Sequence, residues 1–407
     1  MISHKDIKTF GKKELGLFCP MKKGGIYMKY RILGKTGLSV SEIGLGGEWL
    51  ERHNTQEVKE VVSYCESKGI NILDCWMSEP NVRTNIGLAL EGHRDKWMIQ
   101  GHIGSTWQKG QYVRTREMVQ VKAGFEDLLT RLKTDYIDLG MIHFVDEEEE
   151  FHRIMSGEFI EYVRDLKAKG TIRHIGLSTH NPAVGKLAAL NGEIEMILFS
   201  VNPAFDMMPA TEDLNQYFAD EYDAKLGGIA PERVELYNIC ERENVGITVM
   251  KGYAGGRLFS AEASPFGVAL TPVQCLHYAL TRPAVASVMV GYDTKKHVDD
   301  AVAYEEATEE EKDYATVLAK APKHAYKGQC TYCGHCAPCP SHIDIAMVNK
   351  LTDLALMQPE VPASLKAHYS QLSANAKDCV KCGGCETRCP FGVKIIEKME
   401  QAQKCFG

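Results

Sequence analysis

Two cysteine runs near the C-terminus carry the clearest chemistry in this sequence. They read Cys330-x-x-Cys333-x-x-Cys336-x-x-Cys339-Pro340 and Cys379-x-x-Cys382-x-x-Cys385-x-x-x-Cys389-Pro390. In each run three thiolates recur at the spacing with which a tight loop wraps one 4Fe-4S cluster, and the closing Cys-Pro supplies a ligand to the neighbouring cluster. Eight thiolates are the number that two 4Fe-4S clusters need, so the sequence predicts two such clusters.

Two other uses of cysteine fit these runs less well. Structural zinc sites use Cys-x-x-Cys pairs well separated in sequence, without a third and fourth cysteine in the same run or a trailing proline. Disulfides suit short secreted domains, whereas this chain has 407 residues and no apolar secretory segment near its start. One spacing is unusual, because Cys339 follows Cys336 after two residues instead of three. Which cluster Cys339 binds is therefore left open by the spacing.

The composition is that of a globular protein with a full-sized core. Hydrophobic residues make up 44% of the chain. A formal net charge of -7 and a pI near 6.1 give no electrostatic reason to bind nucleic acid or an anionic membrane. No run of roughly eighteen apolar residues could span a bilayer. Fourteen cysteines without a signal peptide predict a reducing cytoplasm, in an organism that avoids oxygen.

The first 27 residues differ from the rest of the chain. Residues 1–18 are polar and lack the periodicity of a segment that packs on a core. The stretch Lys22-Lys23-Gly24-Gly25 back-translates to a purine-rich run a short distance before Met28, as a ribosome-binding sequence would. We therefore expect residues 1–27 to be a disordered extension or to precede a true start at Met28.

From Lys29 onward, short apolar runs alternate with amphipathic stretches, after an expected hairpin at 30–40. This alternation predicts βα units and a parallel sheet. Eight such units over roughly 280 residues fit a (β/α)8 TIM barrel. A doubly wound sheet is the competing architecture, but Gly44-Leu45-Gly46-Gly47 lacks its glycine spacing. The expected strands are 42–45, 70–73, 97–100, 136–142, 172–177, 196–201, 247–250 and 285–290, and the expected helices are 55–67, 82–90, 115–132, 159–169, 232–243, 271–281 and 295–304.

We expect three parts after the extension: the α/β barrel at 28–306, a helical linker at 307–327, and a small α-helical, ferredoxin-like 4Fe-4S domain at 328–407. The cluster domain is too small to have much core without its clusters. The segment 205–230 is too long for a plain barrel connection, which predicts a functional loop over the barrel mouth. The acidic run 146–150 is expected to be a solvated surface.

Active sites of such barrels form at the carboxyl ends of the strands. Residues just past the expected strands include one acid, three histidines and a lysine, namely Asp74, His102, His143, His180 and Lys251. Each histidine alone could be an ordinary hydrogen-bonding residue. Together with the acid they indicate a proton-transfer site.

The chain from Lys29 to about Tyr304 also resembles the aldo/keto reductase family. Four motifs carry the resemblance: Tyr30-Arg31-x-Leu33-Gly34-Lys35-Thr36-Gly37-Leu38-x-Val40-Ser41, Gly69-Ile70-Asn71-x-x-Asp74, Asp135-Tyr136-Ile137-Asp138-Leu139 leading to Ile142-His143, and Ile175-Gly176-Leu177-Ser178. With the cysteine runs, the chain is similar to the iron-sulfur branch of that family. The resemblance implies an enzyme that reduces carbonyls with a nicotinamide hydride, using an Asp, Tyr, Lys and His tetrad in which the tyrosine donates the proton.

Only half of that tetrad is present. Asp74 matches the acid and His143 the histidine, whereas Glu79 stands at the tyrosine position and His102 at the lysine position. A tyrosine needs a nearby cation to bring its pKa toward neutrality, but a histidine titrates close to neutrality by itself. His102, oriented by Asp74 or Glu79, is therefore the expected general acid/base. A barrel mouth that no longer catalyses is the competing interpretation.

The resemblance also implies that NADP(H) binds across the mouth. Ser178 and Thr179 stand where a Ser-Asn pair would hold the carboxamide, and Val201, before Asn202, replaces the usual stacking aromatic. The loops after the seventh and eighth strands would hold the pyrophosphate through backbone N–H groups and basic side chains, with Lys251, Gly252, Gly291 and Lys295 as candidates. A flavin is a second candidate cofactor, because coupling a hydride carrier to one-electron clusters normally needs such an intermediary.

These residues together predict a cytoplasmic iron-sulfur oxidoreductase that acts on a small carbonyl or hydroxyl compound and passes electrons through two 4Fe-4S clusters. A ferredoxin or flavodoxin is the candidate redox partner, and no oligomeric state is indicated. Two alternatives stay open. The chain could be an electron-transfer protein with a non-catalytic barrel, or a metal-dependent hydrolase or lyase whose metal ligands are His102, His143, His180 and Asp74.

Overall fold

The computed structural model describes residues 27–206, 230–264, 266–319, 336–356, 360–361, 363–389 and 392–407. Nearly all of the expected N-terminal extension and most of the expected loop at 205–230 lie outside these residues. The first two cysteines of the first run, Cys330 and Cys333, also lie outside them.

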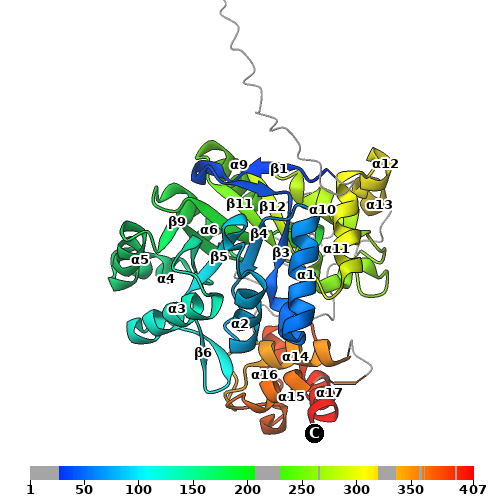
Figure 1. Ribbon diagram of the computed structural model, residues 1–407. Helices are drawn as coiled ribbons and strands as arrows, with labels where there is room; N and C mark the ends of the chain where they lie inside the picture. The colour runs from blue at the N-terminus through cyan, green and yellow to red at the C-terminus, as the bar shows by residue number, and fades with distance from the viewer. Residues whose placement is uncertain are drawn as a thin grey trace, which may run out of the picture.

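Eight parallel strands close into a barrel, in which each strand pairs with the next along the chain and the last pairs with the first (Figure 1). The predicted TIM barrel is confirmed, and every expected strand overlaps an observed one. Buried parallel strands form continuous apolar runs, and these runs allowed the strands to be predicted from the sequence. The strands are β3 (Ile43–Gly46), β4 (Ile72–Cys75), β5 (Met98–Ile103), β8 (Ile137–Ile142), β9 (Ile172–Thr179), β10 (Met196–Ser200), β11 (Gly246–Met250) and β12 (Val285–Gly291).

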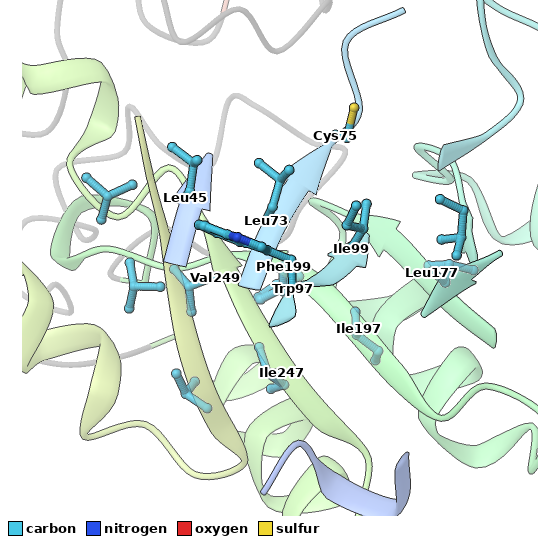
Figure 2. Packing of buried hydrophobic residues seen from close by; sticks show 14 of the residues in the cluster. Leu45, Leu73, Cys75, Trp97, Ile99, Leu177, Ile197, Phe199, Ile247 and Val249 are labelled. Carbon is cyan, nitrogen blue, oxygen red and sulfur yellow. The ribbon is translucent and has the colours of Figure 1, made fainter. Parts of the chain in front are cut away.

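Helices surround this barrel and cover the outward-facing side chains of its strands. Leu45, Leu73 and Ile99 are partners in register on the neighbouring strands β3, β4 and β5, and they lie side by side in one apolar layer (Figure 2). Burying each such side chain contributes about 1.5–3 kcal/mol. The helices outside the barrel are α1 (Thr55–Ser67), α2 (Pro80–Ala89), α3 (Met118–Leu132), α4 (Glu148–Ser156), α5 (Glu158–Ala168), α6 (Pro182–Leu190), α7 (Pro203–Asp206), α9 (Pro231–Arg242), α10 (Pro272–Leu280) and α11 (Lys295–Val302).

The expected N-terminal hairpin closes the amino-terminal end of the barrel. It consists of β1 (Tyr30–Ile32) and β2 (Ser39–Ser41), which pair antiparallel. Leu33 between them is fully buried and belongs to the apolar cluster inside the barrel. Gly34 has a φ of 50°, and a Cβ there would lie 2.2 Å from the backbone nitrogen of Gly246. Only glycine therefore allows this close approach.

A second hairpin, which the sequence did not predict, follows β5 at the carboxyl end of the barrel. It consists of β6 (Ser105–Gln108) and β7 (Gln111–Arg114). Lys109 and Gly110 form the two-residue turn between them, and both have positive φ, at 51° and 79°. Such turns match the twist of a β-hairpin. The hairpin therefore carries the chain across one side of the barrel mouth.

The C-terminal region is helical, as expected. Its core lies mainly between α14 and α17, where Val348, Leu351, Ile395 and Met399 are buried. No helix among the residues described here is long and apolar enough to cross a bilayer. The helices are α12 (Glu309–Lys312), α13 (Tyr314–Ala319), α14 (Ile345–Leu356), α15 (Ala363–Ser370), α16 (Gly384–Arg388) and α17 (Ile395–Phe406).

These C-terminal helices pack against the carboxyl end of the barrel (Figure 1). His368 of α15 has its Nε2 2.7 Å from Oε1 of Glu51, which follows β3. The His368 ring also lies 5.3 Å from that of Trp107 in the second hairpin. Ala204, after β10, belongs to the same apolar cluster as the C-terminal core. The cluster domain therefore covers part of the mouth at which barrel active sites form.

Glu305, on the opposite side of the barrel, is expected to make stability depend on pH. Burial, and then the charge of Glu42, raise the pKa of Glu305 to about 7, and Lys29 is 3.7 Å away. Because this folded-state pKa exceeds the unfolded value, stability should fall as pH rises from about 4.5 to about 7. Glu305→Gln should remove most of this fall and raise stability at pH 8 by about 1–3 kcal/mol.

Anaerobic thermal unfolding of the two proteins at pH 5 and pH 8 would measure this effect. Glu306→Gln is the control, since Glu306 is the exposed neighbour. Equal pH dependence in wild type and Glu305→Gln would show that Glu305 is ionised in the folded protein.

Candidate active site at the barrel mouth

The carboxyl ends of β4 and β5 bring Asp74, Gln100 and His102 together. Asp74 and Gln100 are partners in register. Their outward-facing neighbours Leu73 and Ile99 pack in the apolar layer, so strand alternation turns Asp74 and Gln100 to the barrel interior. Asp74 Oδ1 accepts a hydrogen bond from Gln100 Nε2 at 2.8 Å and lies 2.9 Å from His102 Nε2. Thr248 of β11 donates to Gln100 Oε1 at 2.7 Å and so helps to fix this amide.

His143 and Tyr112 extend this arrangement into a continuous hydrogen-bond chain. His102 Nδ1 and His143 Nδ1 are 2.7 Å apart, and His143 Nε2 is 2.6 Å from the hydroxyl of Tyr112. His143 directly follows β8, the neighbour of β5 in the sheet. Trp76 stacks on the His143 ring, with centroids 6.0 Å apart and 11° between the planes. The chain of groups therefore runs Asp74–His102–His143–Tyr112.

Donor and acceptor roles along this chain follow from the charge of Asp74. An ionised carboxylate accepts from the Nε2–H of His102, so a neutral His102 must accept at Nδ1. His143 then donates from Nδ1 and accepts at Nε2 from the hydroxyl of Tyr112. One hydrogen lies in each link, so the four groups can pass a proton along without breaking the chain.

Electrostatics decide where an additional proton would reside. Burial, the charge on His102, and then Arg116 and Arg114, lower the pKa of His143 well below its ordinary value. His143 is therefore neutral near pH 7. An additional proton would face the carboxylate of Asp74 only on His102, because Asp74 Oδ1 lies 2.9 Å from His102 Nε2.

The acidic run 146–150 is only partly the solvated surface that we expected. Its last residue, Glu150, is buried and lies in α4. The carboxylate of Glu150 accepts a hydrogen bond from Arg114 at 3.2 Å and another from Arg116 at 3.1 Å. Arg116 also donates to the backbone oxygen of His143 at 2.7 Å. A carboxylate at this position holds two arginines against the strand end that carries His143, and the sequence pattern alone did not reveal this role.

Asp146 organises a second, separate chain with His180 and Lys251. Its Oδ2 lies 2.9 Å from His180 Nδ1, and His180 Nε2 lies 3.1 Å from the Lys251 amine. Burial raises the pKa of Asp146, but the charge and hydrogen bonds of His180 outweigh it and lower that pKa to about 2. His180 is therefore committed to Asp146 and does not join the pair His102 and His143.

This separation contradicts the metal-site alternative. The imidazole nitrogens of His102 and His143 face each other instead of a common point. Within the described ranges, no group of three or more histidine, cysteine, aspartate or glutamate side chains could hold a metal ion. The expected ligand set with His180 and Asp74 does not form, because His180 pairs with Asp146 instead.

Glu79, which the sequence suggested as an orienting carboxylate, caps a helix instead. Its Oε2 accepts from the backbone nitrogen of Val82 at 2.7 Å, at the start of α2. Asn81 also donates to its other oxygen. Asp74 is therefore the carboxylate that orients His102.

The residues expected to hold a nicotinamide carboxamide make hydrogen bonds within the protein. Ser178 accepts from the backbone nitrogen of Phe144 at 2.7 Å, which fixes the left-handed residue after His143 (φ 48°). Thr179 donates to Asp146 at 2.9 Å. Asn202 donates to the backbone oxygen of Lys251, and its side-chain oxygen accepts from the backbone N–H of Ala204. These side chains position the loops of the mouth, and a carboxamide would have to share or displace their partners.

The two loops expected to hold a pyrophosphate differ in how open they are. After β12, a Cβ on Gly291 would lie 2.2 Å from the Trp49 indole, and Lys295 pairs with Glu60 at 3.0 Å. After β11, a Cβ on Gly252 would meet Val288 at 2.9 Å. Gly255 and Gly256, which follow it, have positive φ and open space around them. The loop after β11 therefore fits an anion better than the loop after β12.

Four of the described cysteines line one cavity in the C-terminal region. Cys339 of the first run lines one cavity together with Cys379, Cys382 and Cys385 of the second run. A crossed ligand pattern would bring these four cysteines to one cluster. Arg388 donates to the backbone oxygens of Cys336 and Pro338, so it ties the two runs together. Thiolates are the donor type that a 4Fe-4S cluster requires, and these side chains would have to move closer together to share one cluster.

Comparison with known proteins identifies the barrel. A family model described as the aldo/keto reductase family matches residues 42–321. The chain belongs to the aldo/keto reductase family. A model described as a 4Fe-4S dicluster domain matches residues 329–394, which include all eight cysteines of the two runs. This aldo/keto reductase therefore joins an oxidoreductase barrel to a dicluster domain, as the motifs indicated.

Individual relatives agree with this assignment. The uncharacterized oxidoreductase YqkF of Bacillus subtilis is 27% identical over 274 residues, which cover 65% of this chain and 87% of YqkF. The aldo-keto reductase YhdN of the same organism is 27% identical over 160 residues, covering 37% of this chain and 47% of YhdN. The structure of aldo-keto reductase AKR11C1 from Bacillus halodurans matches with a TM-score of 0.57 at 24% identity, over 73% of this chain and 98% of that one. At this identity the structural match shows the barrel fold.

Tyr112 is the site residue that sequence reasoning missed in this aldo/keto reductase. Its segment shows a usable signal, since Ser105-Thr106-Trp107-Gln108 and Gln111-Tyr112-Val113-Arg114 flank a Lys-Gly pair. Aromatic and β-branched residues around such a pair indicate a hairpin. A hairpin directly after a barrel strand must lie at the mouth, which would have placed Tyr112 near His102 and His143.

Proposed function

We propose that this aldo/keto reductase interconverts a small carbonyl compound and the corresponding alcohol, and that its clusters carry electrons between the barrel and an external carrier. The observation that supports the proposal best is the chain Asp74–His102–His143–Tyr112, at the mouth that the cluster domain partly covers. Interconverting a carbonyl and an alcohol moves one proton for each hydride equivalent. A relay of carboxylate, imidazole and phenol is suited to that task.

The chain's own residues supply the binding groups for the cofactors we propose. Cys339, Cys379, Cys382 and Cys385 would hold one 4Fe-4S cluster, and the other cysteines of the two runs a second. Lys251 and the open glycines at 255 and 256 would bind the phosphates of NADP(H), which supplies a hydride when bound. A flavin is the second candidate, because it can pass two electrons to one-electron clusters singly.

The surface of the cluster domain supports an external one-electron carrier such as a ferredoxin or flavodoxin. Cys382, at the rim of the cysteine cavity, is exposed. Val380 next to it is an apolar side chain that is 67% exposed. We also propose a reducing cytoplasm for this enzyme, in which its fourteen cysteines would stay reduced.

Anaerobic assays of the purified holoenzyme would test the proposal. A panel of small aldehydes, ketones and alcohols would be combined with NADPH, NADP⁺ or a viologen dye, after the bound cofactors have been extracted and identified. We expect turnover of one carbonyl and alcohol pair, linked to the dye. Dye reduction without turnover of any substrate, unchanged in an Asp74→Ala, His143→Ala double variant, would favour an electron-transfer protein with a non-catalytic barrel.

A further inference from the structure

Tyr112 is the member of the hydrogen-bond chain that an incoming substrate can reach. Asp74, His102 and His143 are at most 5% exposed, whereas Tyr112 is half-buried. The phenol ring packs edge-on against Trp76, with centroids 5.3 Å apart, and lies edge-on to His143 at 5.6 Å. The hydroxyl is therefore held at the outer end of the chain, with one side toward His143.

The hairpin that carries Tyr112 is held on both of its strands. Arg114 donates to the backbone oxygen of Phe144 at 2.8 Å. Trp107 contacts His368 of the cluster domain, and the tip at Gly110 packs against Gln371. These contacts fix the backbone on either side of Tyr112, so the hydroxyl is held in place for its short hydrogen bond to His143.

The protonation states allow two arrangements of the chain. In the resting state Tyr112 donates to His143, as described above. In the second state the chain holds one more proton. His102 then donates from both nitrogens, His143 donates from Nε2 to the phenol oxygen, and the hydroxyl hydrogen of Tyr112 is free to point to a substrate. The two states differ only in hydrogen positions, and the neutral His143 with its lowered pKa suits both.

We propose that Tyr112 donates the proton to the carbonyl oxygen of the substrate, and that His143 and His102 restore it. The inference rests on the carbonyl and alcohol interconversion proposed above. It assigns the acid to a tyrosine of the hairpin, whereas the sequence alone suggested His102, after Glu79 was found at the family's tyrosine position. Burial raises the pKa of Tyr112, although Arg114 and Arg116 lower it, so the phenol keeps its proton until an alkoxide forms.

The step balances in atoms and charge. The carbonyl carbon gains a hydride equivalent from a reduced nicotinamide, and the carbonyl oxygen gains the Tyr112 proton, which gives the alcohol. The Nε2 proton of His143 moves to the phenol oxygen, and the Nδ1 proton of His102 moves to His143. His102 changes from imidazolium to neutral imidazole, Asp74 remains a carboxylate, and one solvent proton recharges His102. Alcohol oxidation is the reverse.

Tyr112→Phe tests the proposal, because it keeps the ring and removes only the hydroxyl. We expect kcat to fall by roughly 10²–10⁴-fold, with little change in KM and with loss of the solvent isotope effect on kcat. Tyr162→Phe is the control, since Tyr162 lies in α5, outside the chain of hydrogen bonds. Activity of Tyr112→Phe within about threefold of wild type would overturn the proposal.

A readout independent of turnover separates this inference from the proposed function. In ¹⁵N-histidine-labelled protein, the Nε2 resonance of His143 is assigned as the one that His143→Asn removes. Its chemical shift reports the protonation and hydrogen bonding of that nitrogen. Tyr112→Phe should shift that resonance and leave the one from His174 unchanged. If wild type turns over no carbonyl or alcohol, the proposed function fails; if the His143 resonance also stays unshifted in Tyr112→Phe, the Tyr112 inference fails with it.

Discussion

Replacing His102 by asparagine is expected to lower kcat for the carbonyl and alcohol interconversion by roughly 10²–10⁴-fold. Asparagine can still donate a hydrogen bond to Asp74, but its amide cannot take up and release a proton. The chain would then be interrupted between Asp74 and His143, which lie on opposite sides of His102. KM should change little, because His102 is buried beneath the residue that faces the substrate.

The same substitution should alter the pH dependence of kcat. In wild type the proton relay runs through His102, so that step contributes to the pH dependence of kcat, and His102→Asn should remove this contribution. Steady-state kinetics at several pH values would measure both effects. Retention of wild-type kcat would mean that the proton reaches the substrate by another path.

His174→Asn provides a matched control. His174 lies near the start of β9, and its Nδ1 is 2.8 Å from Glu195. It is thus a second histidine paired with a carboxylate on the same barrel, but at the end of a strand away from the mouth. The His174 variant should keep its kcat, which would show that losing a His–carboxylate pair does not by itself inactivate the enzyme.

Replacing Cys382 by alanine is expected to abolish the cluster-dependent activity. Cys382 lines the same cavity as Cys339, Cys379 and Cys385, so its loss leaves three of the four expected ligands. If the clusters are the route of electrons between the barrel and an external carrier, dye-linked turnover should fall at least about 50-fold. Full dye-linked turnover in this variant would mean that the cluster domain is structural.

Folding controls accompany this prediction. The barrel and the cluster domain have largely separate apolar cores, so we expect the barrel of Cys382→Ala to remain folded while the cluster domain loses stability. Circular dichroism and iron content would follow the two effects. Cys405→Ala is the matched control, because Cys405 lies in α17, outside both cysteine runs, and its loss should leave iron and turnover unchanged.

Strand-end residues were predictable from the sequence because the barrel strands are buried on both faces. Continuous apolar runs marked β4, β5 and β8, and the residues past them had to meet at one rim. Asp74, His102 and His143 were found in this way. Their order along a hydrogen-bond chain was not predictable, since it depends on the rotamers of neighbouring strands.

Other parts of the site depended on contacts that no spacing encodes. His180 stands at the same rim, but Asp146 from the preceding loop takes it away from His143. Glu79 occupies the position of a catalytic residue in the family, yet its carboxylate accepts a hydrogen bond from a backbone N–H in the first turn of α2. Tyr112 lies in a short hairpin between a strand and its helix, where the pattern of alternating strands and helices predicted only a connection.

Anaerobic titration of the oxidised holoenzyme with its alcohol substrate tests the central claim most directly. Electron paramagnetic resonance would count reduced clusters while the carbonyl product is measured in the same samples. In wild type, each alcohol oxidised should place two electrons on the clusters, and His102→Asn should show neither product nor reduced clusters. Carbonyl product formed at the wild-type rate with the clusters still oxidised would contradict the account.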